Sequence, residues 1–435
     1  MSALLQQVDM FADIAVLPPV ADMWSLFGAQ NEPFPSLMYP TWMTLVWEAM
    51  HQNGNACDYI SEQVILEATM DRGWMRYGQR KYHTIFLVRV ERLDPAVVRK
   101  LHDFVAGGGR IFCIETIPDR STGWEEHERR DADVRTVVEA MKKFPERFVL
   151  LSRPEKGWML WYKDIQQKYG LTPYVAIDNP DPFVTQVRYQ GRKTEILFFI
   201  NSNVDKGHRM NLTVHKDIAD GRQAWVWDAD TGERWRIGSG AEKIELDLGP
   251  AESRLIVFER GGRGAVYRPA AVAAVAGAVA GSGQTLAGNW TAEFKHIDGS
   301  VRRATLDALK DLKDMPEWAA FSGVVTYRIE FTAGSGRAAG GEALPAWLNL
   351  GRVMGVSEVV LNGKELGVQW YGRRIISVAG AVQAGRNVLE VKVATSMGNY
   401  MKTLKDNPVA QYWTNEKRKD QPLQSMGLIG PVTIY

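Results

Sequence analysis

This chain of 435 residues contains little cysteine and carries almost no net charge. The two cysteines, Cys57 and Cys113, are too few for a disulfide framework or a zinc site. The 52 basic residues are balanced by 51 acidic ones, so electrostatics gives no reason to expect nucleic acid or an anionic membrane as a partner. We therefore expect no metal ion, no cofactor, no nucleic acid and no membrane partner.

The chain also lacks a recognisable export or anchoring signal. Its first twenty residues do not show the basic segment followed by an apolar segment that a signal peptide has. The longest run of low polarity, 270–281, is about half the length needed to span a bilayer. The expected location is cytoplasmic for the chain as written, and periplasmic or secreted if the chain is a fragment of an exported protein.

Aromatic residues are what the chain does contain, with 15 tryptophans and 14 tyrosines. Their large, amphipathic side chains suit both the cores of β-sandwiches and the binding of sugars. For most of them we favour the core, because large apolar side chains are usually buried. The length is too great for one compact domain and is enough for two or three.

The first 171 residues alternate apolar strand-like runs with helical patterns. Strands are expected at 13–17, 82–88, 110–114 and 148–151. A helix is expected to begin at Asp94 and Pro95, an N-cap followed by proline in the first turn, and to stop at the glycines 107–109. This alternation predicts a flavodoxin-like, doubly wound and mainly parallel α/β domain over 1–171.

The remainder of the chain has an all-β pattern in two parts. Short strands separated by turn residues predict a small antiparallel β-sandwich over 181–260. An alanine- and glycine-rich stretch at 261–284 is expected to be a flexible linker. Alternating strands over 285–435, with a hairpin at Asn362 and Gly363, predict a jelly-roll-like sandwich. The expected fold class is therefore multidomain, α/β plus all-β.

Four stretches and the C-terminal ending of the last part form a recognisable set. They are 286–290, 321–327 leading into Phe331, 350–353 with 358–367, 385–389, and the ending 425–432. Together they resemble the galactose-binding-like, sugar-binding jelly roll attached to glycoside hydrolases of families 2 and 106. Asn362 with Gly363 supplies the positive φ angles of a tight turn, and Gly385 with Asn387 sets the next turn. Because these roles are structural, the resemblance bears on the fold more than on contact with sugar.

A second set of residues lies in the first part of the chain, at 58–62, Gly73, 81–82 and 104–110. It resembles the glutamine-amidotransferase-like domain that follows the catalytic barrel in several glycosidases. With the two β domains, the whole is most similar to the C-terminal half of a bacterial family 106 α-L-rhamnosidase. Members of that family carry their catalytic carboxylates and a calcium site in a (β/α)8 barrel upstream. No such barrel can be fitted into this sequence, so the catalytic residues are unknown and no metal site is carried over.

Nucleophilic catalysis is not indicated by the cysteines and histidines. A glutamine amidotransferase uses a cysteine on a strained strand-to-helix turn with a histidine as base. Cys113 instead lies inside an apolar strand, and Cys57 precedes a different segment. His83, His102 and His127 have no recognisable partner motif. Buried structural cysteines are the favoured interpretation.

Carboxylates at strand ends are the remaining candidates for chemistry. Glycoside hydrolysis needs two carboxyl groups across a sugar site. Glu62 and Glu115 would both lie near strand ends of a doubly wound sheet, where ligands tend to bind. Surface or capping roles are favoured for both. Alternatively, Asp58 and Glu62 face a missing barrel and help its site from outside.

Sugar recognition pairs a flat aromatic ring with polar groups that bond hydroxyls. Trp370, Tyr371 and Arg374 follow the Asn-Gly hairpin and form the best such cluster, with Asn399 as a fourth member. The alternative is that Trp370 and Tyr371 pack against a neighbouring domain. Packing is the favoured role for these two side chains.

Three hypotheses on function follow from the sequence. In the first, the chain is the ancillary C-terminal part of an α-L-rhamnosidase-like hydrolase, inactive alone, with a rhamnose-containing glycan and a catalytic barrel, upstream or on a separate chain, as partners. In the second, it is a stand-alone carbohydrate-binding protein. In the third, it is a structural remnant without a ligand.

Overall fold

The computed structural model describes residues 2–26, 40–229, 231–238, 240–267, 283–333, 346–414 and 421–435. The chain divides into two compact units. The first unit comprises 1–203, 207–248 and 253–267, and the second comprises 204–206, 249–252 and 268–435. No helix among the described residues is long and apolar enough to cross a membrane.

A five-stranded parallel sheet forms one half of the first unit. Its strands are β2 (Ile14–Leu17), β3 (Cys57–Tyr59), β7 (Thr84–Val88), β8 (Arg110–Ile114) and β9 (Phe148–Leu151). They lie in the order β3-β2-β7-β8-β9, and every neighbouring pair is parallel. Counted along the chain this order is 2-1-3-4-5, the flavodoxin-like arrangement, so the predicted doubly wound α/β fold is confirmed.

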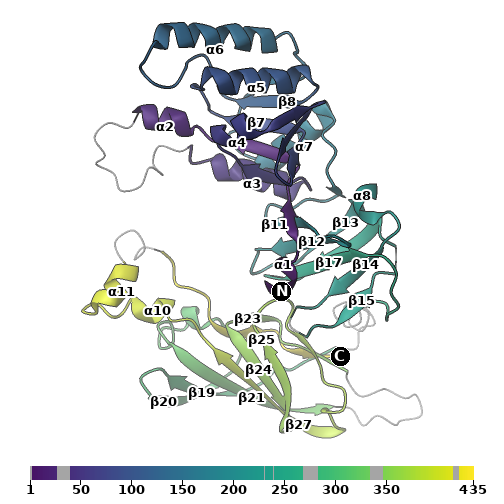
Figure 1. Cartoon of the computed structure of the whole chain (residues 1–435). Coiled ribbons are helices and arrows are strands. Elements are labelled where there is room, and N and C mark those ends of the chain that lie inside the picture. Colours follow the sequence, from purple (N-terminus) through teal and green to yellow (C-terminus); the bar gives the residue numbers. More distant parts are fainter. Residues whose placement is uncertain are drawn as a thin grey trace. The chain divides into compact units, whose positions relative to one another are not determined.

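Helices cover both faces of this sheet (Figure 1). On one face lie α4 (Glu62–Glu67), α5 (Pro95–Ala106) and α6 (His127–Met141), and on the other lie α3 (Met43–Gln52) and α7 (Trp158–Tyr169). Side chains alternate along each strand, so Ile85 and Leu87 pack on the first face while Phe86 and Val88 pack on the second. Burial on both faces explains why these strands are continuously apolar.

The predicted start and end of α5 are confirmed. Asp94 caps the helix by accepting a hydrogen bond from the backbone N–H of Ala96 at 2.8 Å, and Pro95 occupies the first turn. The helix ends at Gly107, and Gly108 follows with a φ of 112°, which is costly for any residue with a Cβ.

The strand expected at 82–88 is in fact two strands of different sheets. A small antiparallel meander consists of β4 (Thr69–Asp71), β5 (Trp74–Tyr77) and β6 (Arg80–Tyr82). β6 ends at Tyr82, and β7 of the parallel sheet begins at Thr84. The sequence gave no sign of this division, because Tyr82 at the end of β6 is buried like the residues of β7.

The other half of the first unit is an antiparallel β-sandwich with a short helix, α8 (Lys216–Ala219). Its six-stranded sheet has the order β1-β11-β12-β17-β14-β15, and its three-stranded sheet has the order β10-β13-β16. The strands are β1 (Asp9–Phe11), β10 (Val175–Ile177), β11 (Val184–Gln190), β12 (Thr194–Asn201), β13 (His208–Val214), β14 (Gln223–Trp227), β15 (Arg234–Arg236), β16 (Lys243–Leu248) and β17 (Ser253–Glu259).

The sandwich and the parallel sheet are connected in two ways, by the path of the chain and by a shared apolar core. β1 follows α1 (Ser2–Leu5) at the N-terminus and pairs with β11 of the sandwich, just before the chain enters β2 of the parallel sheet. One continuous apolar core also runs from α5 into the sandwich. Because the two halves form one compact unit, the boundary expected near Leu171 stays a prediction. Most of the linker expected at 261–284 lies outside the described residues.

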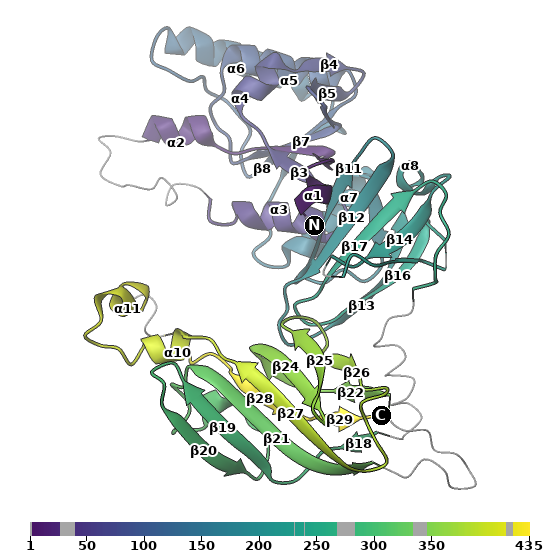
Figure 2. The ribbon, with the colours of Figure 1, turned by 60° about the horizontal axis from the view of Figure 1, so that its bottom comes forward.

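The second unit is all-β apart from short helices. Its sheets have the orders β20-β19-β21-β27-β24-β25, β18-β29-β22-β26 and β23-β28, and Figure 2 shows the short strands of the second sheet gathered together. The elements are β18 (Gln284–Thr285), β19 (Trp290–His296), β20 (Val301–Leu306), β21 (Gly323–Ala333), β22 (Trp347–Asn349), β23 (Arg352–Met354), β24 (Val356–Leu361), β25 (Lys364–Gln369), β26 (Ile375–Ser377), β27 (Gly385–Ala394), α10 (Gly398–Met401), α11 (Pro408–Trp413), β28 (Gly427–Gly430) and β29 (Thr433–Ile434).

The hairpin between β24 and β25 is formed as the sequence predicts. Asn362 and Gly363 have φ angles of 52° and 80°, as a two-residue type I′ turn requires. The Asn362 side chain also accepts a hydrogen bond from the backbone N–H of Val388 at 2.8 Å.

The parallel sheet with its helices and the antiparallel sheets of both units confirm the predicted class, multidomain α/β plus all-β.

Candidate functional site

The two carboxylates predicted at strand ends have separate partners. Glu115 follows β8 with a φ of 70°, and its carboxylate lies 2.7 Å from Nε of Arg153. Glu62 begins α4 and accepts a long hydrogen bond, 3.4 Å, from the backbone N–H of Asp94. Burial raises the pKa of Glu62, the bond from Asp94 opposes this, and the charges of Asp94 and Asp22 add to the increase. They share no partner that would hold them as a catalytic pair.

The strand order reverses between β2 and β7, where ligands bind in many doubly wound folds. Here the loops that follow these strands are bonded to each other. The Asp22 carboxylate on α2 (Val20–Leu26) lies 3.1 Å from the Arg92 guanidinium and accepts a hydrogen bond from the backbone N–H of Glu91 at 3.0 Å. The segments that follow β2 and β7 are thus held together by an ion pair and a hydrogen bond.

Asp58 is engaged within the protein as well. Its carboxylate accepts a hydrogen bond from the Tyr82 hydroxyl at 2.8 Å and lies 3.5 Å from Nε of Arg80. These contacts tie β3 to the meander strand β6. An orientation of Asp58 or Glu62 toward a barrel stays a prediction.

The two cysteines are buried inside the first unit. Burial raises the pKa of the Cys113 thiol and of the Cys57 thiol, and the charges of Asp13 and Asp58 add to the effect at Cys57. Both are therefore held as thiols, whereas the nucleophilic form is the thiolate. This agrees with their interpretation as structural residues.

A buried polar network, which the sequence did not indicate, joins the parallel sheet to the sandwich. The Asn55 side chain donates to Asp13 at 2.7 Å and accepts from Tyr162 and Gln166 at 2.9 and 2.6 Å. Gln186 of β11 donates to the Asn55 carbonyl at 2.9 Å. Because the residues of this network satisfy one another's hydrogen-bonding groups, we interpret the network as structural.

The sugar-binding cluster predicted in the second unit is divided between two segments. Trp370, Tyr371 and Arg374 lie on the loop between β25 and β26, where the first two rings meet edge to face with centroids 4.6 Å apart. Trp370 is 64% exposed. Arg374 is buried and donates to the Gly355 carbonyl at 3.1 Å, and burial lowers its pKa.

Asn399 lies elsewhere, on α10, and is also buried. Its amide donates to the backbone carbonyl of Gln424 at 2.9 Å and accepts from the backbone N–H of the same residue at 2.8 Å. Of the four predicted residues, Trp370 thus presents the most open surface for a sugar. A role in sugar contact stays a prediction for all four.

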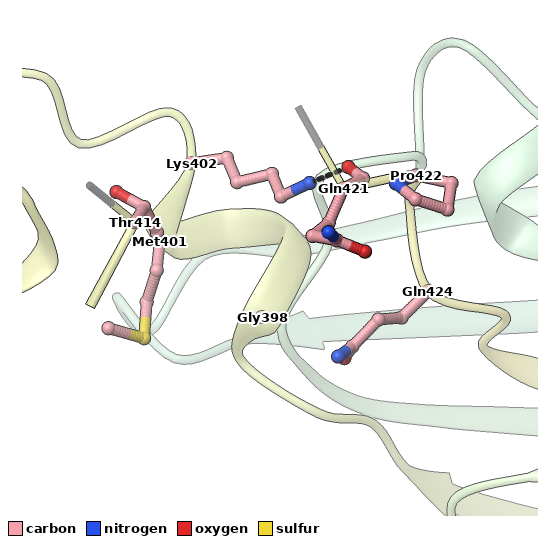
Figure 3. Close-up of a pocket in the computed structure, with 7 residues that line it drawn as sticks. All are labelled: Gly398, Met401, Lys402, Thr414, Gln421, Pro422 and Gln424. Carbon is pink, nitrogen blue, oxygen red and sulfur yellow. Dashed lines mark hydrogen bonds between the residues drawn. The ribbon is translucent and has the colours of Figure 1, made fainter. Parts of the chain in front are cut away.

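Two hollows lie on opposite sides of α10. Gly398, Met401 and Lys402 face one, and Tyr400 and Thr403 face the other, as expected for a helix with 3.6 residues per turn. The first hollow, of about 420 Å³, is also lined by Thr414, Gln421, Pro422 and Gln424 (Figure 3). Since Thr414 and Gln421 border a segment outside the described residues, we assign no ligand to it. The second hollow contains aromatic and charged groups that the sequence did not single out.

The described residues contain no group of three or more His, Cys, Asp or Glu side chains placed to hold an ion. The Asp228 carboxylate accepts from the backbone N–H of Thr231 at 2.9 Å, as in a hairpin turn.

Comparison with known proteins relates the chain to glycoside hydrolases. No family model matches it. Its fold matches the rhamnosidase from Novosphingobium sp. PP1Y with a TM-score of 0.57 and 22% identity, over 100% of this chain and 40% of that one. The GH42 β-galactosidase Gan42B from G. stearothermophilus matches over 58% of this chain and 41% of that one, at 12% identity, and its TM-score of 0.35 does not establish a shared fold.

One curated relative is similar in sequence, a putative β-glucuronidase from Formosa agariphila. The alignment spans 184 residues at 28% identity and covers 34% of this chain and 15% of the relative. The chain thus spans less than half of the rhamnosidase and a smaller share of the glucuronidase. In fold the chain resembles part of a rhamnosidase, and about a third of its sequence is similar to part of a putative β-glucuronidase.

Proposed function

We propose that this chain is the ancillary C-terminal part of an α-L-rhamnosidase-like glycoside hydrolase and supports a catalytic barrel that it does not itself contain. The observation that carries the proposal is the match of the whole chain to 40% of a rhamnosidase. The described residues form an open five-stranded parallel sheet in place of a closed barrel. Glu62 and Glu115, with separate partners, supply no acid/base pair.

The carboxyl edge of the parallel sheet is the surface we assign to the barrel. Trp24 on α2, which follows β2, is 73% exposed, and Trp124, between β8 and α6, is 84% exposed. Both segments leave the sheet at its carboxyl edge, and Glu115 and Arg153 lie at the same edge. Large exposed apolar side chains rimmed by charged groups are typical of protein interfaces.

The test combines the purified chain with a barrel encoded upstream of Met1 or by an adjacent gene. Alone, the chain should release no aryl alcohol from an aryl α-L-rhamnoside; with the barrel it should co-elute in size-exclusion chromatography. Trp124→Ala should weaken this complex several-fold, whereas Tyr77→Ala, which changes an exposed residue on β5 away from the carboxyl edge, should not. Hydrolysis by the chain alone would contradict the proposal, as would the absence of any adjacent barrel.

A stand-alone carbohydrate-binding protein is the second candidate, favoured by the exposed Trp370 on a jelly-roll-like unit. In that case rhamnose-containing glycans should change the tryptophan fluorescence of the isolated chain at millimolar concentration. The absence of a neighbouring barrel together with such a change would favour this candidate. The absence of any change would count against it.

A further inference from the structure

The hollow faced by Tyr400, which we call the α10 hollow, lies where β19 and β20 are joined and has a volume of about 250 Å³. Its floor is Trp318, whose ring stacks on Phe294 with centroids 3.5 Å apart. The Arg302 guanidinium lies over Trp318, 4.3 Å from the ring centroid. Tyr400 meets the His296 ring edge to face at 4.8 Å. The hollow therefore has apolar walls and a polar rim.

The charges on its rim are paired. An Arg302 nitrogen lies 3.6 Å from the Glu317 carboxylate, and Nδ1 of His296 lies 3.1 Å from the Asp298 carboxylate. The rim therefore contains two carboxylates, one guanidinium and one imidazole. It has no excess positive charge that would attract an anion. A neutral ligand rich in hydroxyl groups can donate to the carboxylates and accept from the guanidinium at once.

Two further donors in the hollow have no partner. The indole N–H of Trp318 is buried and makes no hydrogen bond. The Tyr400 hydroxyl makes none among the described residues. A buried donor without a partner costs about 1–3 kcal/mol, and such groups call for an explanation. The Tyr400 hydroxyl, on a half-buried side chain, can donate to an acceptor of a ligand in the hollow, whereas the Trp318 indole N–H is covered by protein atoms.

We propose that the α10 hollow, rather than the loop around Trp370, binds one neutral sugar ring. The volume is below the roughly 300–1,000 Å³ of clefts that hold drug-sized ligands, which limits the occupant to a single ring. Aromatic surface beside paired donors and acceptors suits the two faces of a sugar. This inference rests on the carbohydrate binding of the second candidate function and assigns that binding to named residues.

Indole signals in an NMR spectrum of ¹⁵N-tryptophan-labelled chain test the inference directly. The variants Trp318→Phe and Trp370→Phe each remove one signal and so assign the two competing sites. On titration with L-rhamnose, the Trp318 signal should shift saturably, with a dissociation constant on the order of 1 mM, while the Trp370 signal stays in place. D-glucuronate should bind several-fold more weakly, because its carboxylate meets Glu317 and Asp298.

Substitutions at the rim sharpen the test. Arg302→Ala should weaken L-rhamnose binding about tenfold, because a charge-assisted hydrogen bond is lost. Arg303→Ala is the matched control, since the next residue of β20 points to the opposite face, is paired with Glu293 and is largely exposed. Tyr400→Phe should weaken binding several-fold and keeps the ring that packs on His296.

Other outcomes separate this inference from the proposed function. A shift of Trp370 without one of Trp318 overturns the inference and leaves the carbohydrate contact standing. If neither signal shifts with L-rhamnose, D-galactose or D-glucuronate, the inference is overturned too. In both cases the support of a barrel is decided independently, by the co-elution and hydrolysis experiments.

Discussion

The two units use their buried polar side chains in different ways. In the first unit several of these side chains bond one another across elements, as Asn55 does with Asp13, Tyr162 and Gln166. In the second unit they bond mainly the backbone of nearby loops, as Asn399 does with Gln424. The first arrangement holds two sheets together, and the second fixes individual loops. We therefore expect a lost polar group to cost more stability in the first unit.

The largest effect is expected at the buried ion pair of the sandwich. Arg188 on β11 and Glu195 on β12 lie 3.0 Å apart with side-chain exposures of 6% and 3%, and Arg188 also covers the ring of Phe11 on β1 at 3.9 Å. Glu195→Gln leaves the guanidinium buried without a counter-charge and should lower the free energy of unfolding by about 3–5 kcal/mol. The measurement is the urea midpoint of the transition of the first unit.

A matched control is available on the same sandwich. Glu245 on β16 is paired with Arg209 on β13, and both side chains are largely exposed. Glu245→Gln should change the free energy of unfolding by about 1 kcal/mol or less, because water screens this pair. Equal losses for the two variants would remove burial as the reason for the difference.

A pH dependence is expected next, from His51 in the first unit. This side chain is fully buried, and burial lowers its pKa to about 4, although its bond to the Trp47 carbonyl and the charges of Asp13 and Asp58 oppose the shift. The folded state thus keeps His51 neutral, while the unfolded chain takes up a proton below about pH 6.5. The free energy of unfolding should keep its full value above pH 6.5 and should fall by on the order of 3 kcal/mol as the pH is lowered to about 4.

Urea unfolding between pH 7 and pH 4.5 checks this slope. His51→Gln removes the titrating group and should reduce the slope. The matched variant His102→Gln alters a part-exposed histidine on α5 and should leave it in place. If His51→Gln retained the full slope, another group would have to account for it.

The smallest of these effects is expected in the second unit, at the hairpin turn. Asn362 has a φ of 52°, and its amide donates to the Ala381 carbonyl and to Asn387 at 2.9 and 2.8 Å. Asn362→Ala should lower the free energy of unfolding by about 2 kcal/mol, through backbone strain and lost hydrogen bonds. Asn362→Gly tolerates the positive φ and should lose less, which separates the two causes. Thermal or urea unfolding measures both variants.

Much of the fold was predictable because its signals are local. The strand 110–114 is marked by its continuous apolar side chains, the helix α5 by Asp94 and Pro95, and the hairpin by Asn362 and Gly363. Each signal spans a few residues that contact one another directly. The candidate sites were harder, because burial decides which polar groups remain open. Arg374 and Asn399 looked suitable in sequence, yet both bond backbone groups inside the second unit.

The alternation of strands and helices in the first part, the all-β character of the rest and the two-residue hairpin all follow from the amino-acid sequence. The pairing of β1 with β11, the burial of His51 and the hollow between Tyr400 and Trp318 arise from contacts between distant segments. The reason is the separation along the chain of the residues that interact. Periodicity and turn preferences act within a few residues, whereas these contacts join residues far apart in the chain and exist only once the chain has folded.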